Sequence, residues 1–217
     1  MKNKIQLLAA AALAALTMTG AAQAQEFQPK HKGLLMLNAR VTDVAPRSSN
    51  AILTAAGAGT GLRAAVSDGW APTIGLTYFY TDNIAVEVIA GTTRHTLRAV
   101  GPATDVVVHK TWVLPPVVTL QYHFAPKSQV SPYVGAGVNY MIFYSGSNQN
   151  GFKVDLNDRF GAALQAGVDV ALQGAWSLNL DAKKVFFKTD AAINGGALKS
   201  NVHLDPWVLS AGVGYKF

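Results

Sequence analysis

Apolar and polar residues alternate with a period of two along most of the chain, in stretches of eight to eleven residues. Such alternation is typical of β-strands that have one apolar face. It predicts eight strands, at residues 33–42, 72–81, 84–93, 117–124, 133–143, 161–170, 176–183 and 210–217. After residue 24 the sequence has no long apolar run of the kind that forms a transmembrane helix. We therefore expect an all-β protein.

An even number of amphipathic strands suits a closed antiparallel barrel, because closure leaves no strand edge exposed. Two closed barrels fit the pattern: a lipocalin-like barrel with its apolar face inside, and an outer-membrane barrel with that face toward lipid. The opposite face carries Arg40, Glu87, Gln121, Asn139, Gln165, Asp169, Asn179, Asp181, Lys183 and Lys216. A dry cavity would leave these groups without partners, whereas they can pair inside a narrow membrane barrel. The sequence thus predicts an eight-stranded antiparallel transmembrane β-barrel.

The inward charged and amide groups are expected to close the barrel interior as a polar plug. Its predicted members are Arg40, Glu87, Gln121, Asp169, Asp181 and Lys183. Because buried charges need partners, we expect the cations of Arg40, Lys183 and Lys216 to pair with these carboxylates. A second interpretation is that the charges only satisfy one another and the barrel conducts nothing.

Short and long connections alternate between the predicted strands. The short ones are 81–83, 125–131 and 172–175, and the long ones are 45–71, 94–107, 145–157 and 189–204. Outer-membrane barrels have short periplasmic turns and long external loops, so both chain ends should be periplasmic. Aromatic residues near the strand ends fit interfacial girdles: Trp70, Tyr80, Trp112, Tyr122, Tyr144, Trp176, Trp207 and Tyr215.

The first 24 residues have the three-part pattern of a secretory signal peptide. Lys2 and Lys4 precede an apolar run, and Ala22 and Ala24 mark the cleavage site. Cleavage would leave residues 25–217 as a single barrel domain and would lower the formal net charge from +6 to +4. An exported chain without cysteine has no disulfides, so its stability must come from the strand ladder and packing.

Charged residues make up 14% of the chain, against about 25% in a soluble domain. The basic residues are spread along the sequence, which argues against nucleic acid as a partner. Membrane lipid and lipopolysaccharide are the expected surroundings of such a barrel.

The chain ends on an alternating segment in which Val213, Tyr215 and Phe217 share one face. A strand-shaped, aromatic end can add to the edge of another sheet. We interpret these residues as a signal for the barrel-assembly machinery, and they also suit a simple aromatic anchor at the interface.

Several stretches together resemble one family. They are PTIGLTYFYTDNIAVEVIAG, the Leu-Pro-Pro of 114–116 followed by VVTLQYHF, SPYVGAGVNY, GAALQAGVDV and DPWVLSAGVGYKF. Their order and spacing resemble the outer-membrane protein W (OmpW) family over essentially the whole mature chain. The resemblance implies an eight-stranded barrel with a narrow, largely apolar channel that takes up small hydrophobic molecules.

An eight-stranded barrel is nearly filled by its own side chains, which excludes a wide aqueous pore. Loop 45–71 is apolar for an external loop, so we expect it to form a hydrophobic entrance over the barrel mouth. The predicted entrance residues are Ile52, Leu53, Leu62, Trp70, Trp112 and Leu114. The alternative is a flexible loop without a role in ligand binding.

Pro115 and Pro116 interrupt a predicted strand segment. Proline cannot donate to a ladder, so these residues predict a local gap that an apolar solute could use as a lateral outlet. The alternative is a bulge that only bends the strand. Without any transport, the barrel would be a structural or surface-interaction rod whose loops meet other surfaces.

Enzymatic and metal-binding interpretations find little support in the sequence. His95, His109 and His203 lie at or near the long connections, but no spacing links them to a nucleophile. They also lack the ligand spacing of zinc sites. We therefore expect no catalytic residues, no metal and no cofactor.

Overall fold

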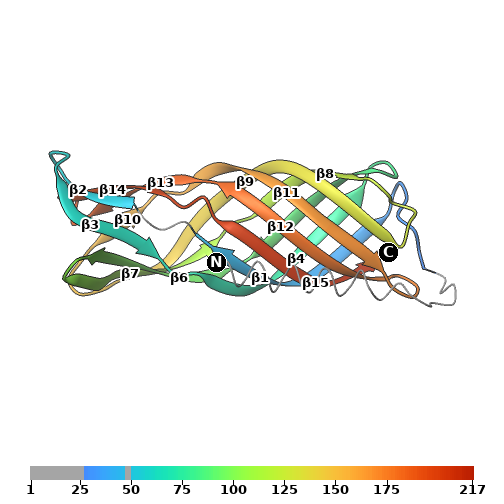
Figure 1. Cartoon of the computed structure of the whole chain (residues 1–217), viewed down its shortest axis with the longest axis horizontal. Helices are drawn as coiled ribbons and strands as arrows, with labels where there is room; N and C mark the ends of the chain where they lie inside the picture. Colours follow the sequence, from blue (N-terminus) through green and yellow to red (C-terminus); the bar gives the residue numbers. More distant parts are fainter. Residues whose placement is uncertain (1–26, 47–49) are drawn as a thin grey trace.

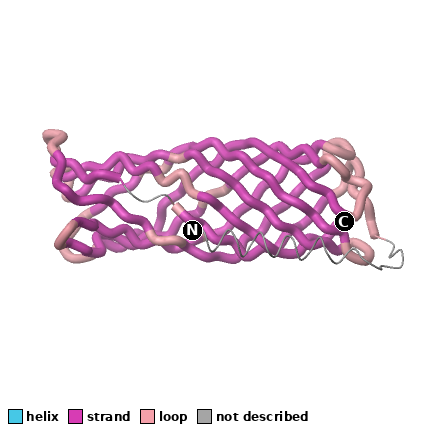
Figure 2. The backbone as a smooth tube through the Cα atoms, in the orientation of Figure 1, coloured by secondary structure: helices cyan, strands magenta, loops and turns pink. Residues whose placement is uncertain are grey.

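Strands account for nearly all of the regular structure and form one elongated cylinder (Figure 1; Figure 2). The structure, a computed structural model, describes residues 27–46 and 50–217. In these residues there is no helix long and apolar enough to cross a membrane. The predicted signal peptide, with Ala22 and Ala24, lies outside the described residues.

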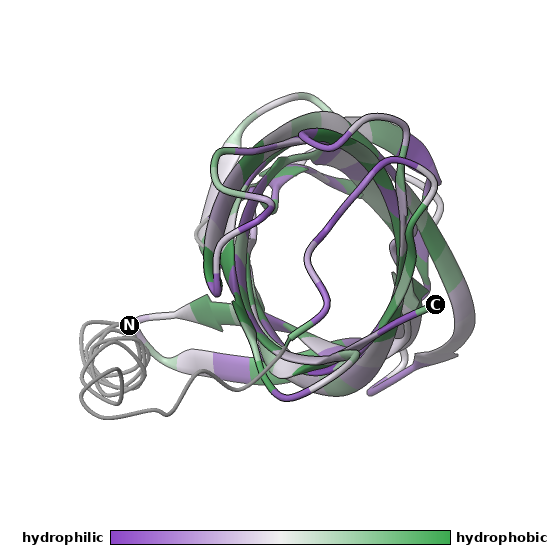
Figure 3. Ribbon diagram, turned by 90° about the vertical axis from the view of Figure 1, so that its right-hand side faces the viewer, coloured by the Kyte–Doolittle hydropathy of each residue, from purple (hydrophilic) through white to green (hydrophobic). Residues whose placement is uncertain are grey.

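Eight strands close into a barrel, which appears as a ring in the view along its axis (Figure 3). In ring order they are β1 (Leu35–Ala45), β4 (Gly69–Phe79), β5 (Ile84–Gly91), β8 (Val117–His123), β9 (Val130–Asn148), β11 (Arg159–Ala171), β12 (Trp176–Phe186) and β15 (Trp207–Lys216). All neighbours are antiparallel, and β15 pairs with β1 to complete the ring. Each predicted strand overlaps one of these eight, so the eight-stranded barrel is confirmed.

The long external connections are themselves largely strand, contrary to their prediction as loops. They contain β2 (Asn50–Thr54), β3 (Gly59–Val66), β6 (Thr93–Gly101), β7 (Thr104–Leu114), β10 (Val154–Leu156), β13 (Lys188–Ile193) and β14 (Leu198–His203). These strands pair with one another and with the outer part of β9, and they extend the cylinder beyond the barrel at the left of Figure 1.

Segment 45–71, which was expected to be a loop, is mostly strand. It supplies β2, β3 and the start of β4. The physical reason is its apolar content: Ile52 and Ala64 are buried in a cluster with Leu97, Val108 and Ile193. Pairing as hairpins satisfies the backbone while this apolar face is removed from water.

The outward face of the barrel is apolar and exposed. Ile74, Leu120, Val138 and Leu164 have 54–60% of their surface exposed. Along β4 and the residue that follows it, this face runs from Trp70 to Tyr80. That length spans about 25 Å along the barrel axis at a tilt of ~40° and matches the apolar band of membrane barrels. The belt is therefore the lipid-facing surface.

Glycines on the inner face let neighbouring strands approach closely. A Cβ atom on Gly137 would lie 1.9 Å from Val118 O and 2.7 Å from Thr119 Cα, which are backbone atoms of β8. A Cβ on Gly75 would lie 3.0 Å from Arg40 Nη1. Gly137 therefore requires glycine for space, and a side chain at Gly75 would press on the ends of Arg40 and Glu87.

Gly137→Ala should separate β8 from β9 and lower the free energy of unfolding by about 1–3 kcal/mol, as overpacking does. Urea unfolding, followed by the gel mobility shift of the folded barrel, measures the effect. Gly59→Ala is the control, because no atom lies within 4 Å of its added Cβ. Equal stability of the two variants would contradict this account of the close approach.

Candidate functional site

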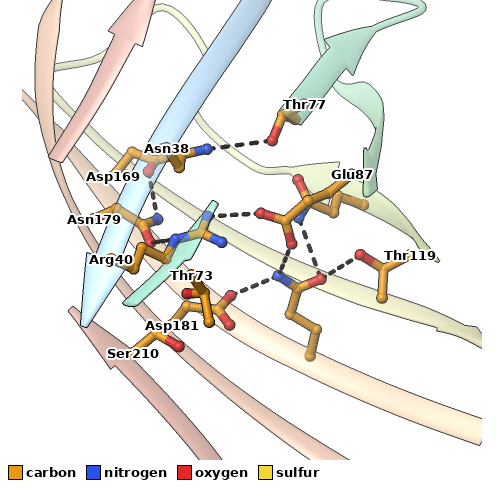
Figure 4. Close-up of polar contacts among 12 residues, drawn as sticks. Asn38, Arg40, Thr73, Thr77, Glu87, Thr119, Asp169, Asn179, Asp181 and Ser210 are labelled. Carbon is orange, nitrogen blue, oxygen red and sulfur yellow. Dashed lines mark hydrogen bonds and ion pairs between the residues drawn. The ribbon is translucent and has the colours of Figure 1, made fainter. Parts of the chain in front are cut away.

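Buried ion pairs lie inside the barrel, and Figure 4 shows the pair formed by Arg40 and Glu87. Arg40 Nη2 lies 2.6 Å from Glu87 Oε1, and Lys183 Nζ lies 3.1 Å from Glu87 Oε2 and 2.5 Å from Asp181 Oδ1. The side chains of all four residues are at most 1% exposed. Because the groups are desolvated, each charge depends on its partners.

Amide and hydroxyl groups connect these pairs across the lumen. Gln165 Nε2 donates to Glu87 Oε2 at 2.9 Å and to Asp181 Oδ2 at 2.5 Å. Gln165 Oε1 accepts from Thr119 Oγ1 at 2.7 Å and from Gln121 Nε2 at 3.2 Å. The network thus joins β5, β8, β11 and β12, and all six predicted plug residues are buried inside the barrel.

The segment 27–32 crosses the mouth of the barrel at the end with the short turns (Figure 3). Lys30 from this segment enters the lumen, where its Nζ lies 2.6 Å from Asp169 Oδ2 and 2.9 Å from Ser131 Oγ. Its backbone N–H donates to Pro126 O, and the Gln28 N–H donates to Gly174 O. The segment therefore ties two turns together across the periplasmic end.

Lys30 corrects the expected pairing of Lys216. The ammonium of Lys216 donates to Gln28 O at 2.6 Å, and the cation beside Asp169 is Lys30. Nothing in the strand alternation marks Lys30, because segment 27–32 is not a strand. The sequence offered one signal for such a residue. Asp169 was predicted to be an inward carboxylate, and the strand pattern did not show which cation pairs with it.

Above the ion pairs lies an apolar chamber of about 90 Å³. Its walls come from both the barrel and the extension: Val66, Ile89, Leu97, Val113, Val117, Met141, Phe143, Val185, Val202, Leu204 and Val208. Polar groups at its edges include Thr73, Asn139 and Lys183. The interior thus changes from charged to apolar along the barrel axis.

His95 lies in the chamber wall on β6. Its Nδ1 lies 2.8 Å from Ser67 O, and its Nε2 lies 2.8 Å from Thr93 Oγ1. Burial lowers the pKa of the imidazole and outweighs the opposing effect of the Ser67 carbonyl. Nδ1 therefore donates to Ser67 O while neutral Nε2 accepts from Thr93, which is a structural arrangement.

The strand ladder has a gap at the chamber wall. Pairing of β5 with β8 ends at Ile89 and Val117, and pairing of β6 with β7 begins at Thr93 and Val113. Between these pairs lie Ala90 and Gly91 on one side and Pro115 on the other, and all three line the chamber.

The opposite side of the proline segment stays bonded to β9. Tyr140 N–H donates to Pro116 O at 3.1 Å. Because successive residues of an antiparallel strand face opposite neighbours, Pro115 faces β5, where it has no N–H to donate. On the outer surface, the Thr92 and Tyr144 hydroxyls lie 2.6 Å apart and bridge the gap.

In the part of the chain that the structure describes, the six predicted entrance residues do not line the chamber. Trp70 and Trp112 point outward, with 62% and 38% of their surface exposed. Ile52 and Leu62 belong to the apolar cluster of the extension. Leu53 is 36% exposed, and the chamber lining within the described residues contains none of these five, nor Leu114.

A closed eight-stranded barrel with an apolar outer belt and a charged interior defines an integral outer-membrane β-barrel. The model of the family described as "OmpW family" matches residues 31–217. The chain therefore belongs to the OmpW family.

Known proteins agree with this assignment. The chain is 44% identical over 155 residues to the "Uncharacterized outer-membrane protein y4mB" of Sinorhizobium fredii, covering 70% of this chain and 67% of that protein. It is 30% identical over 154 residues to the "Dibenzothiophene metabolism operon protein PahQ" of Pseudomonas aeruginosa, covering 70% and 73%. The crystal structure of outer-membrane protein OprG from Pseudomonas aeruginosa superposes with a TM-score of 0.82 at 28% identity, covering 88% and 99% of the chains.

Lys30→Met should lower the free energy of unfolding by about 3–5 kcal/mol, because it leaves Asp169 buried without its cation. Urea unfolding of the refolded barrel measures the loss. Lys127→Met is the control: its side chain is 71% exposed, so its ion pair should contribute at most about 1 kcal/mol.

A double variant, Lys30→Met with Asp169→Asn, should recover much of the lost stability, because the unpaired charge is gone. If the double variant were as unstable as Lys30→Met alone, the ion pair would not explain the effect.

Proposed function

We propose that this barrel is a narrow, passive conduit for small hydrophobic molecules. Solutes enter the chamber from the outer end and leave sideways, into the membrane, through the gap at Pro115 and Pro116. The observation that carries the proposal is that the apolar chamber is lined directly by both edges of the gap, Ala90 and Gly91 opposite Pro115. Transport of this kind involves no chemical step.

The closed lower half of the barrel supports a sideways exit. A solute that moved straight toward the periplasm would have to separate Glu87 from Arg40 and Lys183. It would then meet Lys30 and the segment across the mouth. Separation of buried ion pairs costs several kcal/mol, whereas the gap lacks ladder bonds on one side.

One relative supports the chemistry of the solute. The name of PahQ places that protein in an operon for the metabolism of dibenzothiophene, a flat, largely apolar molecule. A chamber walled by Val, Leu, Ile, Met and Phe offers such molecules a favourable transfer from water. In this proposal the solute enters from the extension, whose interior is lined by the apolar cluster that includes Leu97 and Ile52.

A second function is favoured by the size of the extension. Within the described residues, seven strands besides β9 stand outside the barrel. Their exposed side chains include Arg63, Lys153 and Lys199. A surface-interaction rod would use these positions without any solute. Loss of tracer uptake on deletion of the barrel distinguishes the conduit from the rod.

Two partners belong to this proposal. The outer aromatic ring carries Arg94 over Trp112 at 5.9 Å and Lys184 over Trp207 at 5.3 Å, which suits the phosphates of lipopolysaccharide. The assembly machinery would recognise Val213, Tyr215 and Phe217. In the closed barrel β15 is paired on both sides, so this recognition must precede closure.

Replacement of Pro115 and Pro116 by valine should restore an N–H opposite Gly91 and narrow the gap. One ladder hydrogen bond would slow uptake of a small apolar tracer about fivefold. A polar tracer of equal size, in cells with and without the barrel, tests selectivity. Pro132→Val is the matched control, since Pro132 lies in β9 opposite Val168 and away from the gap.

The conduit is contradicted if neither tracer depends on the barrel. A second outcome contradicts only the lateral exit. In that outcome apolar uptake depends on the barrel, but the valine variant at Pro115 and Pro116 and the Pro132→Val control have the same uptake rate.

Tyr144→Phe removes the hydroxyl that bridges the gap to Thr92. Because this bond is exposed and single, its loss should raise the rate of apolar uptake about twofold to fivefold. The same tracer assay measures the change, with Tyr122→Phe as the control on the lipid-facing surface near the periplasmic end. An unchanged rate would show that the bridge does not restrict exit.

A further inference from the structure

One residue of the chamber lining carries a buried polar atom that has no protein partner among the described residues. Asn139, on β9, is 1% exposed and lines the chamber. Its Nδ2 donates to Pro116 O at 3.2 Å, which fixes the orientation of the amide, because an oxygen in that position would face another acceptor. Among the described residues no donor reaches Asn139 Oδ1.

A buried acceptor without a hydrogen-bond partner lowers the stability of the folded protein. Asn139 differs from the other residues that have such an atom because it lines the chamber. The comparable atoms Asn38 Oδ1 and Arg40 Nη1 belong to residues outside the chamber lining. Asn139 therefore combines a place in the chamber lining with a buried oxygen whose hydrogen-bonding capacity is unused.

The charges beneath the chamber determine what kind of donor fits. The buried network contains three cations and three carboxylates: Arg40, Lys183 and Lys30 with Glu87, Asp181 and Asp169. These charges already pair with one another, so an ionised solute would find no free counter-ion in an apolar chamber. A neutral solute meets no such penalty.

We infer that the chamber takes neutral, mainly apolar molecules that carry one hydroxyl or N–H group, which donates to Asn139 Oδ1. This inference rests on the proposed function and names its solute class. A pure hydrocarbon of the same shape fills the same walls but leaves the acceptor unpaired. Asn139 is accordingly the specificity-determining residue of the chamber.

The position of Asn139 also links recognition to the outlet. The same side chain that accepts from the solute holds Pro116 O at the edge of the gap. A solute bound there has its polar group beside the gap and its apolar body against Val117 and Met141. A single neutral hydrogen bond is weak enough to be broken on exit.

Phenol, toluene and anisole form a test set of similar size. Phenol donates through its hydroxyl, toluene carries a methyl group in its place, and anisole has an oxygen without a proton. Without residues 1–24, the chain contains two methionines, Met36 and Met141. Methyl NMR of the barrel in lipid nanodiscs therefore reports chamber occupancy at Met141 and uses Met36 as a reference outside the chamber lining.

Asn139→Leu should weaken phenol binding about fivefold, as loss of one hydrogen bond does, while toluene binding stays within about twofold. Anisole should behave like toluene in every variant. Thr111→Val is the matched control, because Thr111 also lines the chamber but its hydroxyl donates to the backbone carbonyls of Trp112 and Tyr144. If Asn139→Leu does not fold, Asn139→Ala replaces it in the same experiment. The measured quantity is then the ratio of the phenol affinity to the toluene affinity, which should fall.

The inference is overturned if Asn139 variants change phenol and toluene equally, if anisole follows phenol, or if no probe shifts Met141. Cellular uptake of the same probes separates this result from the proposed function. Phenol binding that depends on Asn139, without barrel-dependent uptake, removes the conduit and keeps the binding site. Uptake without a preference for phenol in the binding assay keeps the conduit and removes the inference.

Discussion

The ion pairs between Glu87 and the two cations Arg40 and Lys183 are the constraint on which the interior depends. A membrane barrel turns its apolar residues outward, so its lumen must be filled by polar groups that satisfy one another. Close packing of β8 against β9 at Gly137 and the absence of a Cβ at Gly75 leave the space for that filling. The polar filling of the lower half follows from this requirement, and the apolar chamber lies above it.

Proline chemistry then determines where the wall of the chamber is weakest. Pro116 keeps its carbonyl bonded to Tyr140, whereas Pro115 has no donor for β5. The wall is therefore continuous toward β9 and interrupted toward β5. A bulge would have shifted the register, but β7 and β8 pair with β9 in one continuous register, from Leu114 and Ile142 to Val117 and Asn139.

The period-two alternation was enough to predict the barrel and its inward charges, because both follow from one local rule applied along each strand. Residues 50–66 were misassigned because Gly and Ala carry little alternation, although Ile52 and Ala64 pack within a sheet. The role of Lys30 could not be predicted. Its partner Asp169 is 139 positions away in the sequence, and Lys30 itself is not part of a strand whose alternation would place its side chain inside the barrel. Trp70 and Trp112 were assigned both to the aromatic girdle and to the entrance, because an interfacial aromatic residue looks the same in sequence whether it faces lumen or lipid; their outward exposure fits the girdle.

The length of β9, 19 residues from Val130 to Asn148, has a mechanical consequence. This strand runs without interruption from the periplasmic end into the extension. It pairs with both β7 and β8, and so it joins the barrel to the extension as one continuous strand. On the other side of the gap, β5 and β6 are separated by Thr92 alone. The gap therefore lies between two unlike edges: the β9 side is held by one continuous strand, whereas the other edge changes from β5 to β6 at Thr92.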